Sequence, residues 1–259
     1  MVTGIEKSSM ARCTCYNRIE TVASNYSWSL NTKFGEMVLR RASQRNSAIC
    51  LIGIDGSGKT THALRIVSNL QQSGAKSKYV WFGTPYFLSY PFMVICRVLG
   101  LTETHHLQNG LTVSEHRYYL NKPVALIFPW IQFLDLSIFV FSRVYLAIFL
   151  GFTVVCDRFV YDTLSELMAD VNDDALDHRI IGRLILGLKP RRASVFLLDV
   201  DEVTALRRRP DVPSLKYLAQ RRKNLLTISK HADVQVINAN DGFSSIHERL
   251  TNSSGRNCE

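Results

Sequence analysis

The sequence predicts an α/β fold in which a mainly parallel β-sheet is covered by helices on both faces. Short apolar segments typical of buried strands alternate along the chain with longer segments that have helical periodicity. The first of these strands runs directly into a glycine-rich turn at 53–60, and a helix follows the turn. A length of 259 residues, with 46% hydrophobic and 20% charged residues, suits one substantial folded domain.

Strands and helices can be assigned along the chain from these patterns. Short apolar runs predict strands at 48–53, 78–82, 152–157, 193–200 and 232–239. Helical spacing of apolar residues predicts helices at 59–70, in 85–101 after Pro91, and at 124–150, 163–171, 175–188 and 215–228. The segment 102–122 is polar and rich in histidine, glycine and asparagine, which predicts an irregular loop with some helix.

Residues 124–150 form the most apolar segment of the chain. Asp135 and Arg143 interrupt it, and no uncharged run reaches the roughly 18 residues that cross a bilayer. A long buried helix is therefore favoured over a membrane span. Peripheral membrane contact and packing against a second subunit stay open as alternatives for this helix.

The remaining composition sets the domain limits and the expected compartment. We expect a poorly defined N-terminal extension at 1–46, the folded domain at 47–252 and a C-terminal tail at 253–259; the extension contains no apolar segment of the kind found in secretory signals. The six cysteines show no disulfide framework, which favours a reducing, cytoplasmic location. Neither Cys13 and Cys15 nor the seven histidines have the spacing of a metal site. The net charge of +9 favours acidic partners such as nucleotides, nucleic acid or anionic membranes.

The glycine-rich turn satisfies the pattern GxxxxGK[ST] in full. Glycines let successive backbone N–H groups converge on phosphate oxygens, and the following helix adds the positive end of its dipole. Lys59 is expected to neutralise the β- and γ-phosphates of ATP, and the Thr60 hydroxyl to bind Mg²⁺. The residues expected to hold the nucleotide are Gly53, Ile54, Asp55, Gly56, Ser57, Gly58, Lys59, Thr60 and Thr61.

Two further clusters of charged residues follow later strands of the predicted sheet. Asp157 and Arg158 end the strand at 152–157, and ligands bind at the carboxyl ends of strands in open α/β sheets. Asp157 is expected to orient Mg²⁺, and Arg158 to bind an acceptor phosphate through two parallel hydrogen bonds. An arginine run precedes two prolines and a basic helix, which suits a lid near 207–214 that closes over ATP, although a solvated surface would look the same. The run consists of Arg207, Arg208 and Arg209.

Taken together, these segments resemble the thymidylate kinase family. The stretches "GIDGSGKTT", "VVCDRF", "VFLLDVDEVTALRRRPD", "LAQRRKNLL" and "VQVINANDGFSSIHERL" occur in the order and spacing of that family, over roughly residues 48–250. The resemblance implies a P-loop NTPase three-layer fold with a central five-stranded parallel sheet. It also implies transfer of the ATP γ-phosphoryl group to a deoxynucleoside monophosphate, converting dTMP to dTDP.

The resemblance assigns roles to individual residues. It implies that Asp55 contacts the sugar hydroxyl of the acceptor, that Arg158 binds its phosphate and that Phe159 lines the acceptor site. Because the loop carries Gly56 rather than an arginine, the catalytic arginine is expected among the three arginines of the lid.

The acceptor half departs from the family pattern. After the strand at 78–82 the chain reads "WFGTPYFLSYPF", without the Arg-Glu-Pro-Gly type motif. Two alternatives therefore stay open: a kinase of the same fold that acts on a sugar, a lipid head group or another nucleotide, and a non-catalytic ATP-binding regulatory module. Nucleic acid is not expected as a partner, because the basic clusters at 189–192 and 221–223 come without a nucleic-acid-binding motif.

Overall fold

The computed structural model describes residues 47–106, 112–209 and 214–254, and within them five parallel strands form one sheet. This confirms the α/β class with a five-stranded parallel sheet. The strands are β1 (Ala48–Ile52), β2 (Ser77–Trp81), β5 (Thr153–Asp157), β6 (Ala193–Asp199) and β7 (Gln235–Asn238), in the order β2-β5-β1-β6-β7. The predicted extension at 1–46, the lid residues 210–213 and the tail residues 255–259 lie outside the described residues.

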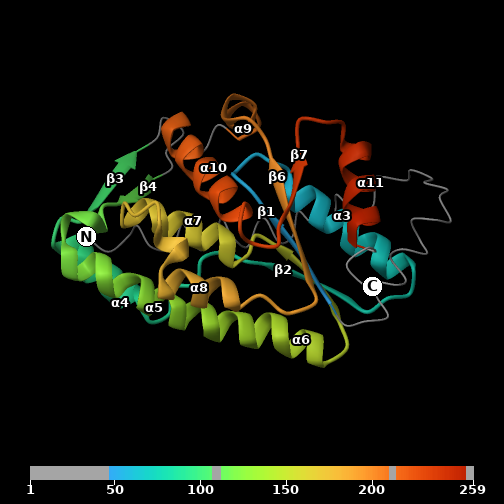
Figure 1. The fold of residues 1–259 in the computed structure, drawn as a ribbon, viewed down its shortest axis with the longest axis horizontal. Coiled ribbons are helices and arrows are strands. Elements are labelled where there is room, and N and C mark those ends of the chain that lie inside the picture. Colours follow the sequence, from blue (N-terminus) through green and yellow to red (C-terminus); the bar gives the residue numbers. More distant parts are fainter. Residues whose placement is uncertain (1–46, 107–111, 210–213, 255–259) are drawn as a thin grey trace. The chain divides into compact units, whose positions relative to one another are not determined.

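Helices cover both faces of this sheet (Figure 1). One face carries α3 (Lys59–Gln72) and α11 (Phe243–Ser254). On the other face lie α5 (Lys122–Val140), α7 (Val160–Asp170), α8 (Ile180–Gly187) and α10 (Leu215–Ser229). From β1 to β2 the chain crosses the sheet in one direction, and from β2 onward it crosses in the opposite direction. Because such crossovers are right-handed, the connecting helices lie on opposite faces.

The three central strands form the buried core and fix the position of the loop. Every residue of β1 and β5 is buried, so their sequences "AICLI" and "TVVCD" do not alternate as half-exposed strands do. In the pairing register Leu51 of β1 and Trp81 of β2 both lie opposite Asp157 of β5. The carboxyl ends of these strands therefore meet at one edge of the sheet, where the glycine-rich turn begins.

The segment 102–122 differs from the expected irregular loop. It contains an antiparallel hairpin of β3 (Thr102–His106) and β4 (Thr112–His116), followed by the short 3₁₀ helix η1 (Tyr118–Leu120). The polar composition suggested a loop. However, the first and third residues of β3 are threonines, and β4 begins with a threonine and a valine. β-Branched residues at these positions favour extended backbone even when the surrounding residues are polar.

The helices also depart in detail from the sequence-based boundaries. The helix α4 (Ser89–Val98) begins before Pro91, which sits in its first turn, where a missing N–H is tolerated. The predicted helix at 175–188 is divided into the 3₁₀ helix η3 (Leu176–His178) and α8. The long apolar helix runs through α5, the π-helical segment η2 (Phe141–Tyr145) and α6 (Leu146–Phe149). A short helix, α9 (Glu202–Arg208), follows β6.

Candidate functional site

The glycine-rich turn forms a tight loop between β1 and α3. Gly56 and Gly58 have φ angles of +87° and +89°, which L side chains rarely adopt. A Cβ atom on Gly56 would lie 2.4 Å from the carbonyl oxygen of Ala205 in α9. Glycine is therefore required at this position for the loop to pack against α9. Because α3 begins at Lys59, the first backbone N–H groups of that helix also lie at the loop.

Lys59 is buried and lies across this loop. Its Nζ donates hydrogen bonds to the carbonyl oxygens of Gly53 and Ile54, both at 2.7 Å, and to Oγ of Ser57 at 3.3 Å. Burial lowers the pKa of Lys59 to about 8, and the positive charge of Arg158 adds to this effect. The ammonium group is thus held within the loop and loses its charge more readily than an exposed lysine does.

Three oxygen-bearing side chains meet beside Lys59. The hydroxyl of Thr60 donates a hydrogen bond of 2.6 Å to Oδ2 of Asp157, and the hydroxyl of Tyr79 donates one of 2.8 Å to the same oxygen. Asp157 is buried, while Thr60 is exposed in the first turn of α3, as is the neighbouring Thr61. The structure therefore brings together the two residues that the sequence suggested as ligands of Mg²⁺.

Arg158 follows Asp157 and turns toward the glycine-rich loop. Its φ angle of +70° lies in the left-handed region, which costs a non-glycine residue about 1–2 kcal/mol. One guanidinium nitrogen donates to Oδ1 of Asp55, and the other lies 4.0 Å from Oε1 of Glu166. The strained backbone thus points this guanidinium at a carboxylate of the loop, and such strain is typical of functional sites.

Arg221, on α10, completes this group of charges. Its Nη1 lies 2.9 Å from Oε1 of Glu166, 3.1 Å from the hydroxyl of Tyr217 and 3.6 Å from Oδ2 of Asp55. The side chain is almost completely buried, yet its Nε and Nη2 make no hydrogen bond. Buried N–H groups without an acceptor are uncommon in folded proteins, so these two are candidates to bind a ligand.

The carboxylates of the site have opposite pKa shifts. Burial raises the pKa of Asp55, but the charges of Arg158, Lys59 and other arginines outweigh it and lower the pKa to about 2. Burial raises the pKa of Asp162, and the nearby positive charges do not fully compensate. The carboxylate of Asp162 accepts hydrogen bonds from the backbone N–H groups of Gly53 and Phe159. Asp162 therefore fastens the start of α7 to the loop.

The lid arginines occupy three different positions at the end of α9, and all are exposed. Arg208 lies over the loop, with Nη1 3.4 Å from the carbonyl oxygens of Gly56 and Ala239. Arg209 lies close enough to lower the pKa of Asp55. Arg207 shows no contact to the loop among the described residues. Two of the three candidates thus lie near the loop.

Phe159 occupies a different position from the one that the resemblance implies. Its side chain is completely buried, and its ring packs edge-on against Phe82 and lies near Tyr161. In this structure Phe159 belongs to the hydrophobic core and offers no exposed surface to an acceptor.

Three residues of the site were not predicted from the sequence, namely Asp162, Glu166 and Arg221. A signal for Arg221 exists, because it stands between Leu218 and Leu225 on the buried stripe of α10. The same observation changes the interpretation of the basic cluster at 221–223. Arg221 is buried, Arg222 pairs with Asp199 and Glu202, and Lys223 pairs with Asp174.

The site consists of two adjoining parts. We call the loop backbone with Lys59, Thr60 and Asp157 the loop side; the arginine side consists of Asp55, Arg158, Glu166 and Arg221. The loop side offers backbone N–H groups and an ammonium group to an anion, and hard oxygen ligands to a divalent cation. The arginine side offers guanidinium groups to a second anion. Comparison with known proteins finds no matching family model and no matching curated protein.

Proposed function

We propose that this chain is an ATP-dependent phosphotransferase with a P-loop NTPase fold, of the thymidylate kinase type. The observation that carries the proposal is the contact between Arg158 and Asp55. It links the carboxyl end of β5 to the glycine-rich loop, so that groups suited to two different phosphates lie on either side of one carboxylate. A second group of guanidiniums beside the loop is what a separate acceptor phosphate would require.

The residues of the loop side fit MgATP. The positive φ angles of Gly56 and Gly58 allow a tight loop, in which successive backbone N–H groups can converge on phosphate oxygens. The hydroxyl of Thr60 and the carboxylate of Asp157 are hard oxygen ligands of the kind that Mg²⁺ prefers, and they already lie 2.6 Å apart. Bound MgATP would supply the phosphoryl group and neutralise part of its charge. Lys59 would hold the terminal phosphates in line with the acceptor.

The arginine side is proposed to hold the acceptor. Arg158 and Arg221 would bind its phosphate, and Asp55 would accept a hydrogen bond from a hydroxyl of its sugar. In the structure both guanidinium groups are paired with carboxylates, so an incoming phosphate must compete with Asp55 and Glu166. Additional positive charge from the lid, with Arg208 and Arg209 nearest to the loop, would favour the phosphate in this competition.

The first acceptor to test is dTMP, as the family resemblance implies. The connection from β2 to α4 favours a second candidate, an acceptor with an apolar part, such as a lipid phosphate. It bears Thr84, whose hydroxyl donates a 2.8 Å hydrogen bond to Glu166, and it continues into exposed Tyr86, Phe87 and Leu88. An apolar path therefore begins beside the carboxylate that holds Arg221.

The test is a coupled ADP-release assay over candidate acceptors. It compares dTMP with other nucleoside monophosphates, phosphorylated sugars and short-chain lipid phosphates, with the Lys59→Ala variant as the control for contaminating kinases. We expect acceptor-dependent ADP release that this variant lacks. ATP binding without acceptor-dependent release across the whole set would favour the regulatory module instead.

A further inference from the structure

The helix formed by α5, η2 and α6 carries two apolar stripes rather than one. Its inner stripe, which includes Phe128, Leu136 and Val144, is buried in the core. The opposite side carries large apolar residues at every third or fourth position, with exposures from 37% to 84%. We call this set the outer stripe; it consists of Trp130, Leu134, Ile138, Phe141, Tyr145 and Phe149. A helix at the surface of a soluble domain ordinarily carries polar residues on that side.

The neighbouring helix α4 extends this exposed apolar surface. It packs against α5, and the two helices lie side by side (Figure 1). Val94, Ile95, Val98 and Leu99 are exposed on and just after α4, with Val98 83% exposed. Large apolar side chains exposed together on two packed helices are typical of an interaction site.

The exposed charges of α4 and the long helix have one sign. The helix contains a single acidic residue, Asp135, which is completely buried and accepts hydrogen bonds from the backbone N–H groups of Leu88 and Ser89. The charged residues exposed along α4 and the long helix are Arg97, Lys122 and Arg143, all positive. A partner that covers this surface must therefore offer an apolar region that contacts the outer stripe and negative charges around that region.

We propose that the outer stripe docks this domain onto the surface of an anionic lipid bilayer. A second copy of the chain packed through these helices would bring the same positive charges together without exposed acidic groups on the helices to oppose them, whereas anionic head groups pair with them. Trp130 and Tyr145 have the apolar ring and polar tip that favour the membrane interface. By length and composition 122–149 could span a membrane, but its inner stripe and Asp135 hold it against the domain. The helix therefore lies in the interface, parallel to the membrane.

Vesicle sedimentation of the full-length chain tests this proposal independently of any kinase activity. We expect binding to vesicles that contain phosphatidylglycerol, weaker binding to pure phosphatidylcholine, and loss of the difference at high salt. The affinity of the double variant Phe141→Ser, Phe149→Ser for these vesicles should be at least about tenfold lower, because two exposed rings no longer enter the bilayer. The control is Val236→Ser, which changes an exposed apolar residue on β7, outside the outer stripe.

Two results would overturn the proposal. One is vesicle binding that is absent, or that the double variant retains at wild-type strength while its unfolding midpoint is unchanged. The other is a wild-type dimer in light scattering that the double variant converts to a monomer without any vesicle binding in either form, because the surface is then a subunit interface.

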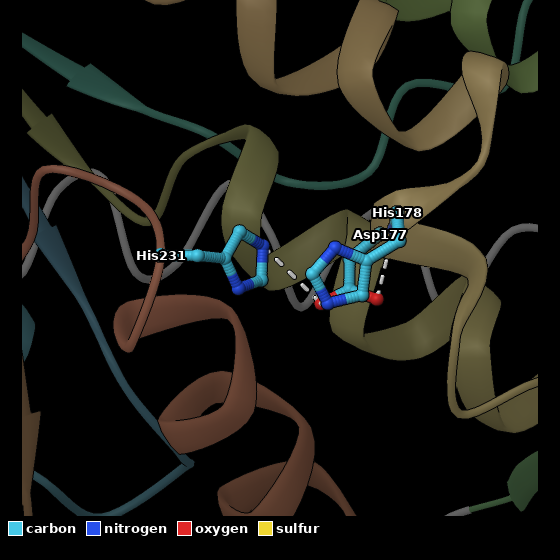
Figure 2. Close-up of side chains that lie close together, drawn as sticks. All are labelled: Asp177, His178 and His231. Carbon is cyan, nitrogen blue, oxygen red and sulfur yellow. Dashed lines mark hydrogen bonds and ion pairs between the residues drawn. The ribbon is translucent and has the colours of Figure 1, made fainter.

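A separate cluster, outside the candidate functional site, has the donor set of a metal centre (Figure 2). Asp177 and His178 belong to η3, and His231 follows α10. The carboxylate of Asp177 is fully buried; its Oδ1 accepts from the N–H of His178, and its Oδ2 makes no hydrogen bond. That oxygen lies 3.3 Å from Nε2 of His231 and 4.0 Å from Nε2 of His178.

We infer that these three side chains bind a divalent transition metal of the Zn²⁺ class. One carboxylate and two imidazoles suit Zn²⁺, and bonds of about 2.0–2.1 Å place tetrahedral ligand atoms about 3.4 Å apart. The separation from His231 already matches this value, and the side chain of His178 is 65% exposed, with its ring centre 4.4 Å from that of His231. The ion would join η3 to the end of α10, the helix that carries Arg221.

Calorimetric titration with Zn²⁺ of the full chain, in a Cys13→Ser, Cys15→Ser background, tests this site. We expect one Zn²⁺ per chain, a higher unfolding midpoint with Zn²⁺, and loss of both in Asp177→Asn and His231→Ala. His116→Ala, which alters a histidine outside the cluster, should retain both. Absence of binding in the parent, or equal binding and stabilisation in His231→Ala, would overturn the inference.

Discussion

The loop side and the arginine side of the site differ in how the chain builds them. The loop side comes mainly from one continuous stretch, 53–60, and its ligands are largely backbone groups held by glycine conformations. The arginine side is assembled from the loop, the end of β5, α7 and α10, and it depends on side-chain charges. A continuous motif fixes its own geometry, whereas an assembled cluster exists only when several elements have packed.

The two sides also respond differently to substitution. A side chain can be removed from the loop side while the backbone cradle stays in place. On the arginine side every charge is paired, so removing one leaves its partner buried without compensation, at a cost of about 3–5 kcal/mol. Variants of the first kind test chemistry directly, and variants of the second kind require a parallel measurement of stability.

The largest effect is expected for Lys59→Ala. If Lys59 neutralises the terminal phosphates of ATP, turnover falls by about 10³-fold, because one of the main charges facing the phosphoryl group is lost. The unfolding midpoint should not fall, since a buried ammonium group is removed along with its desolvation cost. Steady-state ADP release and thermal unfolding measure the two quantities. Lys76→Ala, at an exposed position after α3, is the matched control.

Retention of wild-type turnover by Lys59→Ala would remove the proposed role of the loop side. A comparable loss in Lys76→Ala would show that general charge, rather than the position of Lys59, decides the rate.

The second largest effect is expected for Arg221→Lys. The substitution keeps the positive charge but removes the planar fork, so the KM for the acceptor should rise about 10- to 100-fold while the KM for ATP changes little. The measurement is initial rate against each substrate in turn. Lys223→Met, two residues along α10 at an exposed position paired with Asp174, is the matched control.

An increase confined to the KM for ATP would assign Arg221 to the loop side. A fall in the unfolding midpoint without a change in either KM would reduce its role to holding α7 against α10.

Much of the loop side could be predicted from the sequence. The apolar runs located the five strands of the parallel sheet, and the spacing of glycine, lysine and threonine placed a tight turn before α3. Asp157 and Arg158 were placed at the carboxyl end of a strand, and in the structure they lie next to Thr60 and Asp55. These predictions depend on local patterns, which survive folding because parallel strands end at a common edge.

The arginine side could be predicted only in part. Glu166 and Arg221 are 55 positions apart in sequence, and only the packing of α7 on α10 brings them together. Arg221 lies on the same helix stripe as several leucines. Because it is charged, its sequence context favoured an exposed side chain over a buried one. Phe159 was assigned by resemblance to the acceptor, and the structure buries it because the turn at Arg158 directs the next side chain inward.

The third effect concerns pH and distinguishes the two sides by titration. Lys59 has a pKa of about 8, so the free protein loses this charge as the pH rises through that value, whereas Asp55, with a pKa of about 2, stays ionised. We therefore expect kcat/KM for ATP to fall up to tenfold per pH unit above pH 8. Bound phosphate restores the ammonium form, so kcat should depend less on pH. Rate profiles between pH 6 and pH 10 with saturating acceptor measure both, and a kcat/KM that stays level to pH 10 contradicts the assignment.

The smallest effect on turnover, and a measurable one on stability, is expected from His62 on α3. His62 is buried and stacks on Phe243 of α11, and burial lowers its pKa to about 4 from an ordinary value of 6.5. The unfolded chain takes up the proton first, so stability is full above pH 6.5 and falls toward pH 4, by at most about 1.4 kcal/mol per pH unit for this residue. His62→Phe should keep the stacking and reduce the loss between pH 7 and pH 5 in urea unfolding, while the exposed His178→Gln, with chelator present, should not. Asp55 does not titrate in that range, and an unchanged pH dependence in His62→Phe would show that His62 is not the group responsible for the loss of stability in acid.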